Sequence, residues 1–268
     1  MTRLMFFTVG TSLFHSASWE PTNDLLADAP SYRELVHEER KTSPEARAVC
    51  RRARLELEDA LTEANAARWA GYLPAVLLRD GRHAADSVLR FSAELATLLR
   101  LVEQENEGRS ARRFLQNYAH LFVLTDPTAP PRDATRRSWV AAVHLTAYLD
   151  AIAGGSAAEL SPVPGLASLD REILFSADSG LPLLSRRIGD LKRDRDAEFV
   201  DVVITGGYKI YGLVLARLLG REPLAHAAAR LIYGHESGGN LLIVRDAEIS
   251  YDGKSVSPSA FLPRPGLT

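Results

Sequence analysis

The chain has 268 residues, of which 46% are hydrophobic and 25% are charged, which is enough apolar material for the core of one large globular domain. The formal net charge of −2 argues against the strong basic field that binding of long nucleic acid requires. Cys50 is the single cysteine, so an intramolecular disulfide and a cysteine-based zinc cluster are excluded. The sequence contains no secretory signal pattern and no apolar run long enough to span a membrane, so we expect a cytoplasmic protein without a membrane partner.

The first predicted element is a buried strand that is followed by a turn. Leu4 to Val9 is apolar except for Thr8, as expected of a strand covered on both faces. Gly10 then allows a tight turn, after which Thr11 and Ser12 present backbone amides and hydroxyls. Amides at such a turn carry a partial positive charge and attract anions. This loop is therefore a candidate phosphate site.

A charged, alanine-rich stretch follows at residues 20 to 72 and predicts two helices with solvated faces. No linker separates it from the rest of the chain, so we interpret it as a helical insertion within one fold. A short strand is predicted at Leu73 to Leu78. The spacing of apolar residues then predicts an amphipathic helix at Asp86 to Glu105.

The central part of the chain continues the alternation of strand and helix. Leu121 to Leu124 predicts a buried strand, and Asp126 follows it, either as a residue near a ligand or as part of an ordinary Asp-Pro turn. Asp133 to Ile152 predicts a helix. Two loop-forming glycines, Gly154 and Gly155, close it.

Residues 156 to 182 have the least regular pattern. Their serine, proline and glycine content predicts a loop, with a short strand at Glu172 to Phe175. A helix at Leu183 to Lys192 should then deliver the chain to the next strand.

A second strand and turn resemble the first in their physical character. Phe199 to Ile204 predicts a strand, and Thr205, Gly206 and Gly207 follow it as a turn. Tyr208 and Lys209 come next, at the mouth of a predicted helix that ends at Gly220. Tyr208 either stacks on a base or fills the junction of helix and sheet.

The carboxyl-terminal part predicts a hairpin. Arg230 to Tyr233 and Leu241 to Val244 are short apolar strands separated by Ser-Gly-Gly-Asn. The alternation along the chain predicts an α/β fold, with a Rossmann-like, mostly parallel sheet, flanking helices and this closing hairpin. We expect one domain over residues 1–250 and an irregular tail over 251–268.

The two turns carry the functional prediction because the carboxyl ends of parallel strands meet at one edge of a sheet, where ligands bind. Neither turn has the spacing of a dinucleotide fingerprint or of a P-loop. Two such turns in one chain nevertheless favour a shared site for an anionic, nucleotide-like ligand.

The sequence resembles the CRISPR-associated Rossmann fold (CARF) family. The resemblance rests on the Gly-Thr-Ser turn, on Thr-Gly-Gly-aromatic-Lys, and on three further stretches: Ser92 to Leu95, which is similar to a Ser/Pro-Ala-Glu signature, Leu121 to Asp126, and Tyr233 to Val244. It covers most of the chain and is weakest at residues 20 to 72 and 156 to 182. Tyr208 stands where the family more often has phenylalanine.

The resemblance implies a ligand, a partner and an activity. CARF proteins bind cyclic oligoadenylates, the second messengers of type III CRISPR systems, at a homodimer interface. It implies a ring nuclease that binds cyclic tetra-adenylate and cleaves it without metal or cofactor, with Ser12 and Lys209 as catalytic residues. The ligand-binding residues it implies are Gly10, Thr11, Ser12, Asp126, Thr205, Gly206, Gly207, Tyr208 and Lys209.

Three alternatives stay open at this point. The chain could be a sensor that binds the ring and regulates a partner effector without cleaving it. It could instead be an unrelated nucleotide-binding α/β protein. A HEPN ribonuclease site is a weaker alternative, since Arg113 and His120 have roughly the required spacing but straddle a predicted helix end and strand start.

Overall fold

The structure is a computed structural model. The structure describes residues 2–9, 44, 62–67, 70–71, 92–105, 110–127, 134–166, 168, 170–204, 228–234, 241–245, 248–251 and 254–256.

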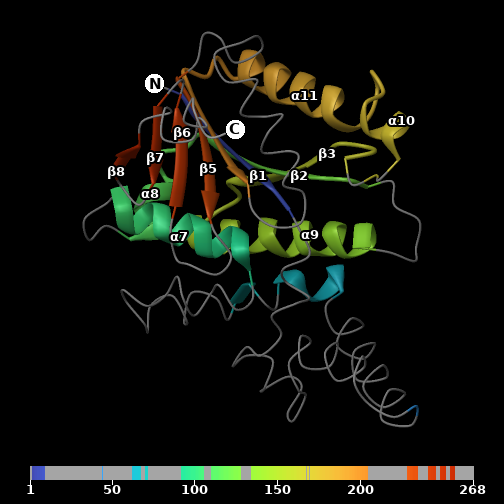
Figure 1. Ribbon diagram of the computed structural model, residues 1–268. Helices are drawn as coiled ribbons and strands as arrows, with labels where there is room; N and C mark the ends of the chain where they lie inside the picture. Colours follow the sequence, from blue (N-terminus) through green and yellow to red (C-terminus); the bar gives the residue numbers. More distant parts are fainter. Residues whose placement is uncertain are drawn as a thin grey trace.

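In the described part of the chain, eight strands form a sheet in the order β3-β2-β1-β4-β5-β6-β7-β8 at the centre of the fold (Figure 1). The strands from β3 to β5 in this order are parallel to their neighbours, and β6, β7 and β8 are added antiparallel. Their bounds are β1 Arg3–Thr8, β2 His120–Thr125, β3 Ala158–Pro162, β4 Phe199–Ile204, β5 Ala228–Gly234, β6 Leu241–Arg245, β7 Glu248–Tyr251 and β8 Lys254–Val256. The predicted α/β class, with its mostly parallel Rossmann-like sheet and antiparallel hairpin, is confirmed.

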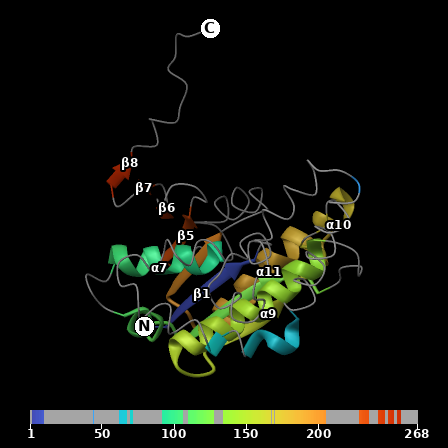
Figure 2. The same ribbon diagram turned by 90° about the horizontal axis from the view of Figure 1, so that it is seen from below.

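Helices cover both faces of the sheet. On one face lie α7 and α9, which Figure 2 shows side by side beneath the strands, and α11 lies on the opposite face. The described helices are η1 Glu63–Asn65, α7 Ala93–Glu105, α8 Ala111–Leu115, α9 Ala134–Ala153, α10 Arg171–Leu174 and α11 Gly180–Asp194.

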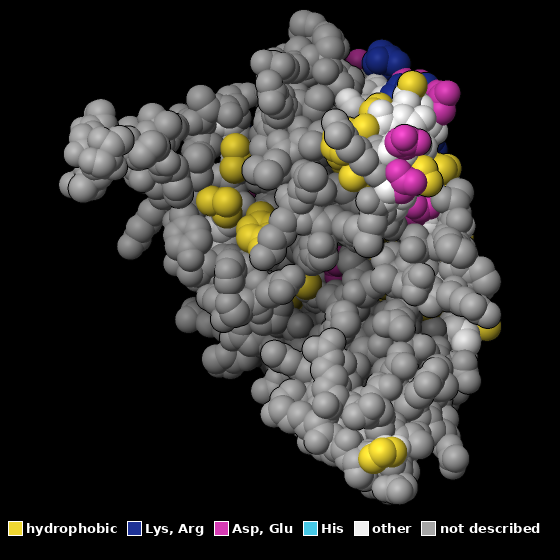
Figure 3. Space-filling view, turned by 45° about the vertical axis from the view of Figure 1, so that its right-hand side comes forward, with side chains coloured by type: hydrophobic (Ala, Val, Ile, Leu, Met, Phe, Trp, Pro, Cys, Tyr) yellow, Lys and Arg dark blue, Asp and Glu magenta, His cyan; other side chains and the backbone are white. Residues whose placement is uncertain are grey.

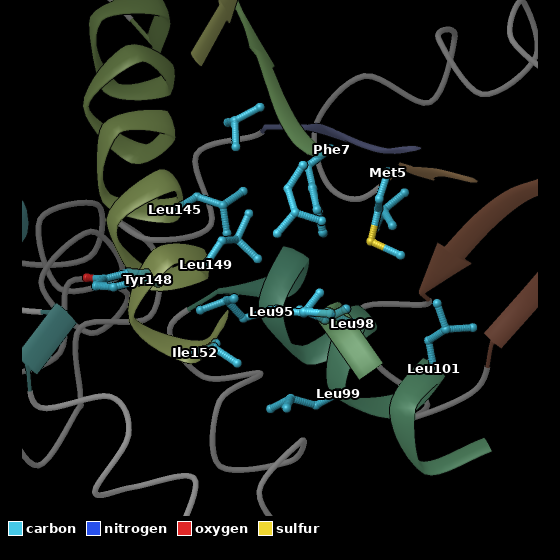
Figure 4. Packing of buried hydrophobic residues seen from close by; sticks show 14 of the residues in the cluster. Met5, Phe7, Leu95, Leu98, Leu99, Leu101, Leu145, Tyr148, Leu149 and Ile152 are labelled. Carbon is cyan, nitrogen blue, oxygen red and sulfur yellow. The ribbon is translucent and has the colours of Figure 1, made fainter. Parts of the chain in front are cut away.

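The side-chain alternation of β1 explains why the sequence shows an unbroken apolar run. Met5 and Phe7 point into the core between the sheet and the helices α7 and α9, where they meet leucines of both helices (Figure 4). Leu4 and Phe6 point into the second core, against α11. A strand covered on both faces is apolar at nearly every position, and all four of these side chains are fully buried.

The strand order contains one reversal of direction. From β1 the chain moves outward to β2 and β3, then returns past β1 to add β4 and β5 on the other side. The reversal lies between β1 and β4, which pair in parallel from Arg3 opposite Phe199 to Thr8 opposite Ile204. In open α/β sheets this switch point is where ligands bind.

The prediction for residues 156 to 182 was wrong in two respects. Residues 158–162 form β3, which was missed because an edge strand needs no continuous apolar run and tolerates a terminal proline. Residues 172–175, predicted as a strand, belong mainly to α10, whose start is held by the Asp170 carboxylate accepting from the Glu172 amide at 2.8 Å. Ile173 and Phe175 are 44% and 51% exposed, and hydrophobic and acidic side chains mix on the surface over α10 and α11 (Figure 3).

The prediction of an irregular tail was also wrong in part, since β7 ends at Tyr251 and β8 occupies residues 254–256. Tyr251 pairs with Lys254, so exactly two residues, Asp252 and Gly253, connect the strands. Asp-Gly between β-prone residues is a strong hairpin signal. The remainder of the tail, the predicted strand at 73–78 and most of the helical insertion at 20–72 lie outside the described residues.

Candidate functional site

The carboxyl ends of β1 and β4 form the centre of the candidate site. Thr8 ends β1, Ile204 ends β4, and the two residues are paired in register. Neighbouring strands are about 4.8 Å apart, so the chain leaves the sheet at two adjacent points, in the same direction. The two predicted turns therefore begin side by side at the topological switch point.

Most of the predicted site residues lie outside the described part of the chain. These are Gly10, Thr11 and Ser12 after β1, and Thr205, Gly206, Gly207, Tyr208 and Lys209 after β4.

Asp126 is the predicted site residue that the structure describes. It follows β2 directly and is 4% exposed. Since Thr8 pairs with Leu124, Asp126 lies two residues beyond the level of Thr8, on the strand adjacent to β1. The structure thus places this carboxylate on the same edge of the sheet as the starts of both turns.

Two threonines close the ends of these strands. The Thr8 hydroxyl donates to the Val203 carbonyl at 3.4 Å, and the Thr125 hydroxyl donates to the Ser138 carbonyl at 3.5 Å. Both threonines are buried. Each of these two hydroxyl protons is therefore used inside the fold.

The amino terminus of α7 approaches the same edge. Ser92 caps it, accepting from the Leu95 amide at 3.3 Å. One turn into the helix, Thr97 packs against Gly234, the last residue of β5, so closely that a Cβ on Gly234 would lie 2.0 Å from the Thr97 hydroxyl oxygen. At its other end, α7 reaches back along β5, where Glu105 pairs with Arg230.

This arrangement places a further carboxylate at the edge. Glu94 lies in the first turn of α7, is 2% exposed, and accepts from the Ser92 hydroxyl at 3.1 Å. The sequence did not mark Glu94 as a site residue. Its only signal was its place in the Ser-Ala-Glu stretch, because burial of a helix residue depends on tertiary packing that a single sequence does not reveal.

A buried ion cluster lies in the amino-terminal half of the sheet. The Arg230 guanidinium donates to both oxygens of Asp201, at 2.7 Å each, and also pairs with Glu105. The Tyr118 hydroxyl donates to Asp201 as well, and Arg3 stacks over the Tyr118 ring at 5.0 Å. Asp201 precedes the end of β4 by three residues, about 10 Å along a strand. The cluster is therefore structural and separate from the candidate site.

The pKa values of the cluster follow from burial and charge. Burial lowers the pKa of the Arg230 guanidinium, but the hydrogen bonds and charges of Asp201 and Glu105 outweigh this effect and raise the pKa above its usual range. Burial, followed by the charge of Asp201, raises the pKa of the Tyr118 hydroxyl. Both groups thus keep their ordinary protonation state at neutral pH.

A buried histidine joins the helical insertion to the core. His144 of α9 is fully buried. Its Nδ1 lies 3.0 Å from the Tyr148 hydroxyl, and its Nε2 lies 3.1 Å from the Thr62 carbonyl oxygen. Because a carbonyl can only accept, Nε2 carries the proton and Nδ1 accepts from Tyr148. Burial lowers the pKa of His144 to about 4, although the bond to Thr62 raises it.

The two residues of the HEPN alternative lie away from the carboxyl edge. Arg113 is in the last turn of α8, and His120 is the first residue of β2, at its amino end. Burial, followed by the charge of Arg195, lowers the pKa of His120.

Within the described ranges, no cluster of three or more histidine, cysteine or acidic side chains is placed to hold a metal ion. In the same part of the chain, no helix combines the length and the apolar character needed to cross a bilayer. Comparison with known proteins found no protein-family model that matches the chain and no similar curated sequence.

Proposed function

We propose that this protein binds cyclic tetra-adenylate at a homodimer interface and cleaves it without a metal ion, ending a signal of type III CRISPR defence in the cytoplasm. The observation that carries the proposal is the in-register pairing of Thr8 with Ile204. It supports a single site to which both turns contribute residues, because the chain segments that carry Ser12 and Lys209 start from adjacent strands at the switch point.

The chemistry suits a phosphodiester. Backbone amides after a strand end favour an anion, and the ammonium of Lys209 adds a full positive charge. The Thr8 and Thr125 hydroxyls donate inside the fold, and in the proposed site residues of the two turns hold the phosphate. These requirements agree with the role of Gly10, Thr11, Thr205, Gly206 and Gly207 as a backbone cradle.

The proposed reaction uses a nucleophile that the substrate carries. The ribose 2′-oxygen attacks the adjacent phosphorus, the bond from phosphorus to the 5′-oxygen breaks, and the products carry a 2′,3′-cyclic phosphate and a 5′-hydroxyl. The proton of the 2′-hydroxyl is lost and the leaving oxygen gains one, so the reaction is balanced without water. Ser12 orients the 2′-hydroxyl, and Lys209 stabilises the charge on the pentacoordinate phosphorus.

A two-fold symmetric ring suits a two-fold symmetric dimer. Each subunit of such a dimer presents the same surface, so a ring of four nucleotides meets two identical sets of turns. Asp126 and Tyr208 complete the proposed ligand-binding set, with the Tyr208 ring stacking on adenine.

The experiment that tests the proposal is product analysis. Purified protein incubated with cyclic tetra-adenylate in EDTA should yield linear di-adenylate with a 2′,3′-cyclic phosphate, identified by mass spectrometry. Tight binding without product would instead favour the sensor alternative. No binding of the ring, together with binding of a mononucleotide or dinucleotide, would overturn the proposal in favour of an unrelated nucleotide-binding protein.

A further inference from the structure

The segment between β3 and α11 exposes two large hydrophobic side chains. Ile173 in α10 and Phe175 directly after it are 44% and 51% exposed, whereas Leu174 between them is buried in the core against α11. In Figure 3 hydrophobic surface lies here among acidic side chains. Asp170, Glu172, Ile173 and Phe175 are called the α10 patch below.

The residues beneath the α10 patch hold it in one conformation. Ile173 packs so closely on Gly165 that a Cβ on this glycine would lie 2.8 Å from the Ile173 Cγ2 atom. The Ser179 hydroxyl donates to the Ile173 carbonyl at 2.5 Å. The amide of Gly180, a residue with a φ of 57°, donates to the Pro164 carbonyl at 2.7 Å and closes the loop. A partner that docks on so well supported a surface pays little for ordering it.

The arrangement of the patch is that of a binding surface. Single exposed hydrophobic residues are common on proteins and need no explanation. Here two of them project from one short, supported segment, and charged side chains flank them. An apolar centre with a polar rim is the usual anatomy of a protein interface, in which a few large apolar side chains supply most of the binding free energy.

The rim of the α10 patch is acidic. Asp170 and Glu172 are exposed, and neither forms an ion pair with another described residue. Asp178, further along the loop, is paired with Arg186 at 3.6 Å. Residues 170–178 contain three acidic side chains and one arginine. This negative balance favours a partner of positive charge.

The same charge argues against other occupants of the patch. Anionic lipid headgroups and the phosphates of a nucleic acid would be repelled by the acidic rim. A second copy of the chain, related by a two-fold axis through the patch, would bring the acidic rim against itself, and opposed like charges are unfavourable. A basic protein segment meets neither obstacle.

We propose that the α10 patch docks a segment of a partner protein in which apolar side chains are flanked by lysine or arginine. The apolar side chains cover Ile173 and Phe175, and the basic groups pair with the rim. Pro162, the last residue of β3, pairs with Thr125 at the end of β2. The segment that carries the patch therefore leaves the sheet at the edge of the candidate site. The inference goes beyond the proposed function and does not depend on it.

The test uses the full chain, with a phage-displayed library of random peptides as the probe. Peptides selected on the wild-type protein are counter-selected on the double variant Ile173→Ser with Phe175→Ser. The peptides that remain should combine apolar side chains with lysine or arginine. A labelled peptide from this set should bind the double variant at least about tenfold more weakly in fluorescence anisotropy. Added salt should weaken its binding to the wild-type protein, because the rim charges are exposed.

Reversal of one charge tests the rim separately. Glu172→Lys should weaken binding of the same peptide by about tenfold, because this side chain then repels the basic groups. Glu159→Lys is the matched control, since Glu159 is exposed in the amino-terminal half of β3, and it should leave the affinity unchanged. Urea denaturation should show the same midpoint for all three variants and the wild type, because exposed side chains contribute little to stability. If the double variant alone is destabilised, Glu172→Lys decides.

Three results would overturn the proposal. The first is a set of recovered peptides without basic residues. The second is equal affinity of a peptide for the wild-type protein and the Glu172→Lys variant. The third is a wild-type dimer, seen by sedimentation, that the double variant loses, since this would assign the patch to a contact between two copies of the chain. None of these measurements uses a cyclic oligoadenylate, so failure of the proposed function would leave this test intact.

Discussion

At the scale of single residues, Lys209 is the side chain whose removal most directly tests the proposed chemistry. Loss of one group that stabilises charge in the transition state costs roughly a hundredfold in rate in well-studied enzymes. We therefore expect Lys209→Ala to slow single-turnover cleavage of cyclic tetra-adenylate by at least about tenfold, with binding still measurable. Lys192→Ala is the control, since Lys192 lies in the last turn of α11, which leads to the amino end of β4. Equal rates in the two variants would remove Lys209 from the mechanism.

Single residues also show the limit of what the sequence could predict about the site. The two turns were visible because glycine after an apolar run is a local signal. The sequence alone did not show that the strands before these turns are neighbours, which the pairing of Thr8 with Ile204 establishes. The burial of Glu94 had no such signal, because a glutamate in the first turn of a helix is ordinary in sequence and its burial depends on tertiary packing.

At the scale of elements, the position of α7 depends on the ion cluster at its far end. Arg230 of β5 bonds both Asp201 of β4 and Glu105 of α7, so it ties the helix to the two strands. Arg230→Ala would leave the Asp201 charge buried without its main partner, and we expect a loss of about 3 to 5 kcal/mol in the free energy of unfolding, measured by urea denaturation.

The control for this prediction is an exposed ion pair of similar chemistry. Arg193 and Asp190 pair on the surface of α11, with side chains 67% and 39% exposed. Since exposed pairs contribute little, Arg193→Ala should change the free energy of unfolding by less than about 1 kcal/mol. A loss of similar size in both variants would show that the buried Arg230 cluster contributes no more to stability than an exposed ion pair does.

The secondary-structure elements differed in how clearly the sequence predicted them. The strands β1, β2 and β4 are covered on both faces, so their sequences are mainly apolar and have a clear interpretation. The buried Asp201 of β4 is a charged exception. Among the described strands, β3 lies at the edge of the sheet beside β2. It carries Glu159 and Pro162, which locally resemble a loop. Of the apolar residues that favoured a strand, Ile173 in α10 and Phe175 directly after it are exposed, and only Leu174 is buried, so hydrophobicity alone misassigned this segment.

At the scale of the whole molecule, alternation of strand and helix predicted a parallel sheet but not its strand order. The order places β4 beside β1 rather than beside β3, and this is what brings the first and last thirds of the chain to one edge. Tertiary packing determines the strand order, because several arrangements of the same strands would bury the same apolar runs. The prediction of one domain over residues 1–250 stays a prediction.

The pH dependence of stability should report the burial of His144. Its pKa is about 4 in the folded protein, against about 6.5 in an unfolded chain. As the pH falls below about 6.5, the unfolded state therefore takes up a proton that the folded state does not, and the protein loses stability until about pH 4. This shift corresponds to about 3 kcal/mol in total, and none of it is lost above about pH 7.

Carboxylates also destabilise proteins in acid, so the test is a difference between two proteins. His144→Asn keeps a polar group between Tyr148 and Thr62 but cannot titrate. The free energy of unfolding of the wild-type protein should fall more steeply than that of the variant between pH 6.5 and 4, by up to about 1.4 kcal/mol per pH unit for one proton. Parallel curves would mean that His144 is protonated equally in both states. The hydrogen bond from neutral His144 to the Thr62 carbonyl would then not account for the attachment of this part of the insertion to α9.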